Sequence, residues 1–432
     1  MRSPIPDYLA EALRSVQADR SGATADYIPQ LADADPELLA AALCTLDGHV
    51  YSAGDCGVEF SIQSISKPLV YALALADRGF DEVLGKVWVE PSGDAFNEIS
   101  LEPDSGRPRN PMINAGAITA HSLAGPVGAT PDERFARILD GLSAFAGREL
   151  AVDESVYQSE MTHSFRNRAL ANMLRAHHIL DEEPLLVVDG YTRQCSVLVT
   201  VNDLAIMAAT LANRGVNPVT GRPVVPAPVV RQVLSVMSTC GMYDGAGDWM
   251  TRVGVPAKSG VAGGLIGALP GQVGIATFSP RLDGHGNSVR GVDLFQRFTA
   301  DMGMHLMDAP RAAPSVIRDS RLVGSAAAAI WVLALQGDLR FATAERLVRA
   351  LAEDPPAAPQ VAIDLERVLA VDDVGRRMLL EAVRRLTLDG HQMYLIDPNG
   401  VLPGPDPGDG GRVTVVQDLS EIAESDRSVV RR

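Results

Sequence analysis

The stretch FSIQSISKP (residues 60–68) opens the apolar run LVYALALA (residues 69–76), and the rest of the chain is organised around it. Proline is tolerated in a helix only near its start, so Pro68 predicts that a helix begins here. Ser64 and Lys67 then fall in the first turn, three residues apart on one face. This spacing places a hydroxyl beside an amine.

A helix start and burial both disfavour an ammonium group, so Lys67 would be neutral and able to take the Ser64 proton. This is the serine–lysine form of an activated nucleophile, and the Ser64 N–H would face an oxyanion. The alternative is a capped helix with a solvated lysine, because Ser-x-x-Lys is a short motif.

A second stretch, PAKSGVAGG (residues 256–264), predicts a strand edge whose glycines let the backbone approach a ligand. It carries Lys258 in a Lys-Ser-Gly sequence. Serine acyl-transfer enzymes of the penicillin-binding and β-lactamase type pair Ser-x-x-Lys with a downstream Lys-Thr-Gly on such a strand. Taken alone, Lys258 would be a surface strand lysine, whereas the two motifs together favour serine acyl transfer.

Length and charge narrow the class of protein. A chain of 432 residues predicts two or three domains, and a net charge of −16 argues against nucleic acid and anionic membranes as partners. The first residues do not resemble a signal peptide, and apolar runs are too short to span a bilayer. The four cysteines, Cys44, Cys56, Cys195 and Cys240, lie far apart, which predicts buried free thiols of a cytosolic protein.

The order of predicted elements indicates an antiparallel sheet covered by a helical cluster, followed by a small, partly parallel α/β domain. In the first part we expect a helix at 7–17, a hairpin at 38–52, helices from 115 to about 180, a helix at 204–212 capped by Asn202 or Asp203, and strands at 271–278 and 288–294. Beyond a linker near 308–314 we expect strands at 327–335, 360–365 and 393–396, a helix at 345–352, and a helix ending near Gly390 that Asp372 or Asp373 caps. The predicted domains are 1–308 and 319–432, joined by a linker at 309–318.

Four longer blocks resemble a known family: QSISK (63–67), NPMINAGAI (110–118), FRNRALA (165–171) and CGMYD (240–244). They resemble the serine-dependent glutaminases, whose fold is related to the serine β-lactamases, and the similarity covers about residues 7–308. The resemblance implies an α+β catalytic domain that hydrolyses L-glutamine to L-glutamate and ammonia. No metal and no cofactor is implied.

The same resemblance implies roles for single residues. Ser64 would be the nucleophile and Lys67 its proton partner. Tyr243 would lie near the nucleophile and carry a proton to the departing ammonia, and Val261 would supply a second oxyanion N–H. Whether Lys67 or Tyr243 is the main general base stays open.

Substrate contacts are implied for Tyr27, Gln63, Ser64, Asn114, Glu160, Asn167, Tyr191, Tyr243 and Val261. The chemistry of a free amino acid fits this set, because Glu160 can pair with an ammonium, and amide and phenol groups can donate to a carboxylate. Taken singly, the amides would be buried structural groups, the tyrosines core aromatics, and Glu160 a charge on a helix surface.

Residues from about 319 to 425 resemble a STAS domain, the fold of anti-sigma-factor antagonists. The sequence VDDVG (371–375) matches the family's loop, but Asp373 occupies the position of the phosphorylated serine. Switching by phosphorylation is therefore in doubt, and Asp373 could serve as a helix cap.

The leading hypothesis is a cytoplasmic glutaminase with a regulatory or docking module. The rivals are another serine amidase of the β-lactamase type and a catalytically idle protein that senses glutamine. The resemblance implies a homodimer or homotetramer and leaves a protein partner of the STAS-like domain open, with no nucleic acid bound and no membrane insertion.

Overall fold

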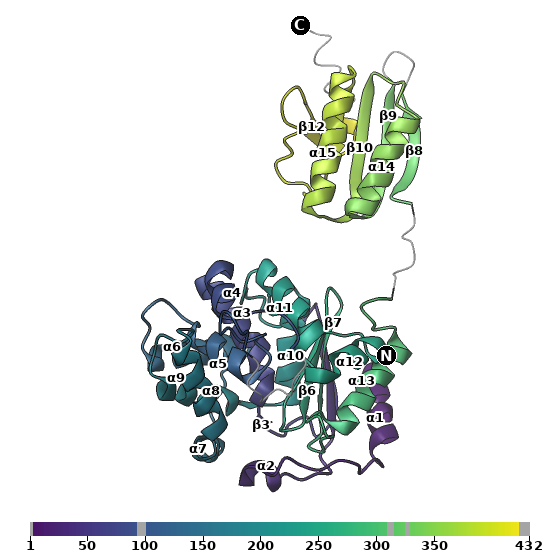
Figure 1. The fold of residues 1–432 in the computed structure, drawn as a ribbon. Helices are drawn as coiled ribbons and strands as arrows, with labels where there is room; N and C mark the ends of the chain where they lie inside the picture. Colours follow the sequence, from purple (N-terminus) through teal and green to yellow (C-terminus); the bar gives the residue numbers. More distant parts are fainter. Residues whose placement is uncertain (1–2, 93–100, 309–314, 325–328, 423–432) are drawn as a thin grey trace. The chain divides into compact units, whose positions relative to one another are not determined.

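A computed structural model describes residues 3–92, 101–308, 315–324 and 329–422. The chain forms two compact units, Met1–Asp308 and Ala309–Arg432 (Figure 1). The predicted linker at 309–318 falls mostly outside the described residues.

The first unit is built on a five-stranded antiparallel sheet in the order β2-β1-β7-β6-β5. The strands are β1 (Ala40–Thr45), β2 (Val50–Gly54), β5 (Ala257–Ser259), β6 (Gly264–Leu269) and β7 (Val273–Phe278). Side chains of a strand alternate between the two faces. Because both faces of this sheet are covered, β1 is apolar from Ala40 to Cys44: Ala41 and Leu43 face one core, whereas Ala42 and Cys44 face the other.

Helices cover both faces of this sheet (Figure 1). On one face, α1 (Ile5–Val16), α12 (Ala246–Arg252) and α13 (Val289–Met302) share an apolar core with the strands. On the other face, α10 (Val201–Ala212) joins the sheet to the helical cluster. That cluster consists of α3 (Ser66–Arg78), α4 (Phe80–Lys86), α5 (Asn114–Ser122), α6 (Pro131–Ala146), α7 (Glu154–Thr162), α8 (Phe165–Ala176), α9 (Pro184–Cys195) and α11 (Ala227–Cys240), with a short α2 (Pro29–Ala32) before β1. The predicted antiparallel sheet with a helical cluster is confirmed.

Two local predictions were wrong. Residues 288–294 belong to the start of helix α13 and not to a strand, and Ser288 caps that helix by accepting from the Gly291 N–H. The cap of α10 is Thr200, not Asn202 or Asp203. Asp203 is the third residue of α10 and accepts from the Thr200 N–H, which completes a capping box.

The second unit has a mixed five-stranded sheet in the order β12-β11-β10-β9-β8, with helices α14 and α15 between strands. It contains β8 (Ile317–Val323), β9 (Ile330–Leu339), α14 (Phe341–Glu353), β10 (Gln360–Val371), α15 (Asp373–Leu388), β11 (Gln392–Ile396) and β12 (Thr414–Val416). All neighbouring strands are parallel except β8 and β9, so the prediction of a partly parallel α/β domain is confirmed. Asp372 caps α15 through the Gly375 N–H, so the suggestion of Asp373 as the cap was wrong.

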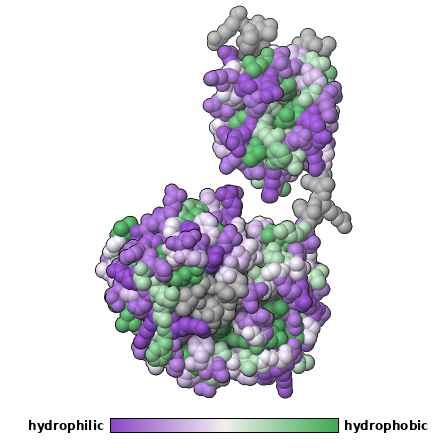
Figure 2. Space-filling view, viewed as in Figure 1, coloured by the Kyte–Doolittle hydropathy of each residue, from purple (hydrophilic) through white to green (hydrophobic). Residues whose placement is uncertain are grey.

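The visible surface of both units is mainly hydrophilic (Figure 2). In the described part of the chain, no helix combines the length and hydrophobicity needed to cross a bilayer. All four cysteines are free thiols, and Cys44, Cys195 and Cys240 are buried as predicted. Cys56 is only half-buried, so the prediction that it is buried was wrong.

Candidate active site

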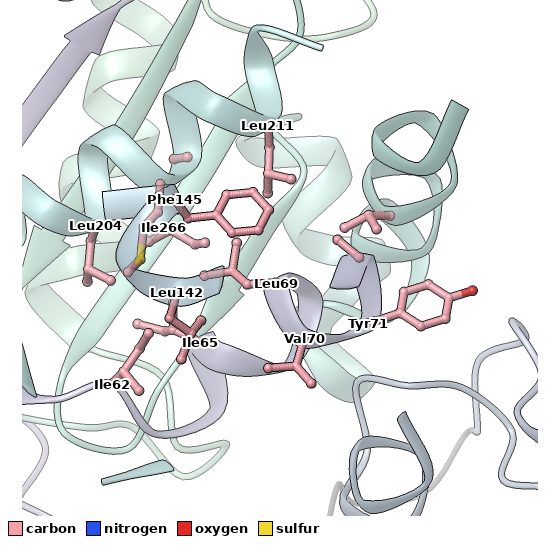
Figure 3. Close-up of a cluster of buried hydrophobic side chains, with 14 of the residues drawn as sticks. Ile62, Ile65, Leu69, Val70, Tyr71, Leu142, Phe145, Leu204, Leu211 and Ile266 are labelled. Atoms are coloured by element: carbon pink, nitrogen blue, oxygen red, sulfur yellow. The ribbon is translucent and has the colours of Figure 1, made fainter. Parts of the chain in front are cut away.

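Ser64 lies on a short 3₁₀ turn, Gln63–Ile65, that leads directly into α3. The prediction placed Ser64 inside the first turn of this helix, whereas Ser64 lies on the turn just before it. Ile62 and Ile65 flank the turn and point into the apolar core together with Leu69 of α3 (Figure 3). Gln63 has a left-handed backbone with a φ of 50°, a strained conformation that persists only where the surroundings enforce it. The core therefore fixes the turn that presents Ser64.

Lys67 is fully buried at the start of α3. Its Nζ donates to the Met112 carbonyl oxygen at 3.2 Å and to Asn114 Oδ1 at 2.7 Å. Burial lowers the pKa of Lys67 to about 8. The alternative of a solvated lysine was wrong, and with this pKa a minor fraction of the Lys67 amine is neutral at pH 7.

Tyr243 starts a 3₁₀ turn, Tyr243–Gly245, that follows α11, and it also has a left-handed backbone with a φ of 55°. Its hydroxyl is buried near the hydroxyls of Ser64 and Ser259. Burial raises the pKa of Tyr243 to about 12, and these two hydroxyls counteract part of the rise. Tyr243 is therefore a neutral phenol near the Ser64 hydroxyl.

Lys258 on β5 is completely buried, so the alternative of a surface lysine was wrong. Its Nζ lies 3.9 Å from the centroid of the Tyr243 ring and donates to the Ser259 carbonyl oxygen at 2.8 Å. Burial, and secondarily the charge of Lys67, hold the pKa of Lys258 well below its usual value. The chain has three lysines, and two of them are thus buried beside Tyr243 and Ser64.

Ser64 opens into a pocket of about 320 Å³, a size typical of small-molecule sites. The predicted residues that line it are Tyr27, Gln63, Ser64, Asn114, Glu160, Asn167, Tyr191 and Val261. Five lining residues were not predicted: His163, Ser164, Arg166, Thr192 and Cys195. Of these, Arg166 lies inside the block FRNRALA, beside Asn167, so its sequence position could have identified it.

The acidic side of this pocket is Glu160 on α7. Its Oε1 accepts hydrogen bonds from the Tyr27 hydroxyl at 2.9 Å and from Gln63 Nε2 at 3.1 Å. Burial raises the pKa of Glu160, and the hydrogen bonds from Tyr27 and Gln63 counteract part of that rise. Glu160 is therefore a partly buried carboxylate inside the pocket, and not a charge on a helix surface.

The amide side of the pocket is a hydrogen-bonded pair. Asn114 Nδ2 donates to Asn167 Oδ1 at 3.0 Å, while Asn114 Oδ1 accepts from Lys67. Tyr191 on α9 is buried and lines the same pocket. The structure thus brings the predicted residues of the 3₁₀ turn Gln63–Ile65 and of α5, α7, α8 and α9 together around one cavity.

Within the residues that the structure describes, no cluster of three or more His, Cys, Asp and Glu side chains is arranged to hold a metal ion. The polar groups of the pocket are one carboxylate, amides, hydroxyls, the Arg166 guanidinium and the His163 imidazole, with a buried amine nearby. This set can bind both charged groups of an amino acid and can move a proton.

Family models match both units of the chain. The Glutaminase model matches residues 22–307, and the STAS domain model matches residues 326–402. A glutaminase of Corynebacterium efficiens is 46% identical over 419 residues, which cover 97% of this chain and 98% of that protein. A glutaminase of Corynebacterium glutamicum is 48% identical over 400 residues, which cover 93% of this chain and 96% of that protein.

A solved structure is similar over nearly the same length. The crystal structure of Mglu in its tris and glutamate form gives a TM-score of 0.87 at 44% identity. The match covers 93% of this chain and 100% of that chain.

Proposed function

This chain belongs to the glutaminase family and carries a C-terminal STAS domain, and on that premise we propose that Ser64 is the nucleophile of its glutamine hydrolysis. The observation that supports this role is the position of Ser64 at the pocket, next to a buried lysine with a pKa of about 8 and a buried tyrosine. The basic test is release of ammonia and L-glutamate from L-glutamine by the purified full-length chain.

Lys67 is the better candidate for the general base. A neutral amine has two N–H donors and one lone pair. Met112 and Asn114 accept hydrogen bonds from Lys67 and hold its amine at the start of α3, and a neutral amine there can accept the Ser64 proton. Tyr243 is less suited, because its pKa of about 12 disfavours the phenolate near neutral pH.

Acylation then transfers the Ser64 proton, through Lys67 and Tyr243, to the departing ammonia. The Ser64 oxygen attacks the side-chain amide carbon of glutamine, and its proton passes to Lys67. The N–H groups of Ser64 and Val261 stabilise the oxyanion that forms. Tyr243 gives its proton to the amide nitrogen as the C–N bond breaks, and the Lys67 ammonium returns a proton to Tyr243. Ammonia leaves, and water then hydrolyses the acyl-enzyme.

Substrate binding uses the two sides of the pocket. Glu160, held by Tyr27 and Gln63, pairs with the α-ammonium group of glutamine. Asn114, Asn167 and Tyr191 supply neutral donors to the α-carboxylate. The site recognises a free amino acid because both charged ends have partners.

Glu160→Gln is expected to raise the KM for glutamine about 100-fold, because the buried ammonium loses its anionic partner at a cost on the order of a few kcal/mol. Steady-state kinetics would measure this change. Glu154→Gln on the exposed side of the same helix α7 is the matched control and should leave KM unchanged. A parental KM in Glu160→Gln would place Glu160 outside the substrate site.

Removal of the second unit tests whether the first unit carries the glutaminase activity alone. A chain that ends at Asp308 should fold and keep kcat and KM within about two-fold, because every residue of the proposed site lies between Tyr27 and Val261. Soluble, folded 1–308 protein without glutaminase activity would show that the functional boundary is wrong.

The family resemblance also supports a cytoplasmic homodimer or homotetramer and a docking or regulatory role for the STAS domain. Light scattering on the full chain and on the 1–308 chain would show whether the STAS domain contributes to assembly. The rival hypothesis of a glutamine sensor predicts that the chain binds glutamine without hydrolysing it. Release of ammonia in the assay would contradict that hypothesis.

A further inference from the structure

A buried hydrogen-bond network connects helices α5 and α9 to the turn that presents Ser64. His121 Nδ1 on α5 is bonded to Gln194 Oε1 on α9 at 2.9 Å, and Gln194 Nε2 donates to Ser66 Oγ at 2.9 Å. Ser66 Oγ in turn donates to the Gln63 carbonyl oxygen at 2.8 Å. Ser66 and Gln194 are completely buried, His121 is 1% exposed, and none of the three lines the pocket. The network therefore reaches the turn from the protein interior.

The proton positions in this network follow from its last acceptor. A carbonyl oxygen can only accept, so the Ser66 hydroxyl gives its one proton to Gln63 and accepts from Gln194. Gln194 then presents its NH₂ group to Ser66 and its oxygen to His121, which donates from Nδ1. Burial lowers the pKa of His121 to about 4, so the ring is neutral in this tautomer. Every bond in the network is thus directed toward the Gln63 carbonyl oxygen.

The fold makes room for the network and holds its last member firmly. A Cβ atom at Gly190 would lie 2.4 Å from His121 Nε2, so the glycine lets the imidazole pack against α9. At the other end, the Ser66 N–H donates to the same Gln63 oxygen as the Ser66 hydroxyl. Gln63 is the residue with the left-handed backbone, a strain that persists only where the surroundings enforce it. Two donors of Ser66 thus hold the carbonyl group of a strained residue.

This carbonyl group shares a peptide plane with the Ser64 N–H. The peptide is trans, so its C=O and N–H bonds point in opposite directions. The carbonyl oxygen points to buried Ser66, and the N–H therefore points away from the network. We propose that Ser66 and Gln194 are positioning residues for the reaction, which fix this peptide plane so that the Ser64 N–H meets the oxyanion. The inference rests on the proposed role of the Ser64 N–H as an oxyanion donor.

The network should act on the transition state more than on bound glutamine. Hydrogen bonds in series polarise one another, so a bond to the carbonyl oxygen makes the N–H of the same peptide group a better donor. The oxyanion charge that this N–H meets develops only when Ser64 attacks. Glu160, the proposed partner of the substrate ammonium, contacts the side chain of Gln63 and not its carbonyl oxygen. The expected effect is therefore on kcat and not on KM.

Ser66→Ala in the full chain should lower kcat about ten-fold and leave KM and the affinity for L-glutamate within two-fold. The loss is smaller than the roughly 10²–10³-fold for removal of an oxyanion donor, because the Ser66 N–H still holds the carbonyl oxygen. Ser196→Ala is the matched control, since it removes an equally buried hydroxyl that donates to the Thr192 carbonyl oxygen at the end of α9, and it should keep the parental kcat. Folded Ser66→Ala protein with parental kcat would overturn the proposal. So would a rise in KM as large as the fall in kcat, which would indicate a general disturbance of the pocket.

A double-mutant cycle tests whether Gln194 acts through Ser66. Gln194→Met keeps the length of the side chain, removes the donor to Ser66 and should lower kcat about five-fold with KM unchanged. In the Ser66→Ala background the same change should have no further effect on kcat. An equal loss in both backgrounds would overturn the proposal, because Gln194 would then act independently of the Ser66 hydroxyl.

Two further variants keep the outcome decisive. If Ser66→Ala does not fold, Gln194→Met alone is the test, and parental kcat in that folded variant would overturn the proposal. Ser64→Ala separates the inference from the proposed function. Lost turnover in Ser64→Ala together with parental kcat in Ser66→Ala would overturn the inference alone, whereas retained turnover in Ser64→Ala would overturn both.

Discussion

Ser64→Ala is expected to abolish glutamine hydrolysis, with a loss in kcat of about 10⁴-fold or more, because the variant lacks the atom that attacks the amide carbon. Ser64 contributes one hydroxyl to a turn that is held by Ile62, Ile65 and Leu69, so the fold should remain intact. A coupled ammonia assay gives the rate, and circular dichroism with thermal unfolding checks the fold.

Binding of L-glutamate by calorimetry is the control for the Ser64→Ala variant, since Glu160 and the amide side of the pocket remain in place. Retained binding with lost turnover would assign Ser64 to chemistry. Turnover within a few-fold of the parent chain would rule out the serine mechanism, and a parent chain that binds glutamine without releasing ammonia would favour the sensor hypothesis.

Lys67→Ala and Lys67→Arg should each lower kcat nearly as much as Ser64→Ala. Alanine removes the base, and arginine stays protonated at all accessible pH values and cannot accept a proton. Because nucleophile and base act as a unit, the Ser64→Ala, Lys67→Ala double variant should be no worse than either single variant. Lys86→Ala, which changes the lysine at the end of α4, is the control and should keep the parental rate.

The pH dependence of the hydrolysis rate follows from the titration of Lys67. Lys67 accepts the Ser64 proton only when it is neutral, and burial lowers its pKa to about 8. The rate should therefore rise as the pH increases through about 8, and this limb of the profile should be lost in Lys67→Ala. A rate that falls across the same range would argue against Lys67 as the base.

The sequence predicted the fold where local patterns and burial agree. Pro68 correctly indicated the helix start next to Ser64, and the apolar stretches near 40–45 and 273–278 became the central strands. The start of α13 was mistaken for a strand because Val289, Val292 and Leu294 suggest strand propensity over a short window. Only the continuation to Phe295 and Phe298 shows the helical spacing that faces the core.

The sequence predicted which residues form the site, but it did not predict their geometry. Motifs and the family resemblance identified Ser64, Lys67 and Tyr243 without indicating that Gln63 and Tyr243 adopt left-handed backbones. The contact between Gln194 and Ser66 could not be predicted, because it joins positions 128 residues apart and depends on how α9 packs beside the turn that presents Ser64. The edge strand β8 was also missed, since its mostly polar, exposed side chains lack the alternation of a half-buried strand.

The scarcity of lysine has a practical consequence for attaching the protein to a surface. Lys67 and Lys258 are buried, so among the three lysines amine-reactive supports and dyes can reach only the partly exposed Lys86. Lys86 ends α4 and binds Asp181 and the His178 carbonyl oxygen, and it contributes nothing to the pocket lining. Among the lysines, ester-activated matrices should therefore react at Lys86 and leave the substrate pocket unmodified.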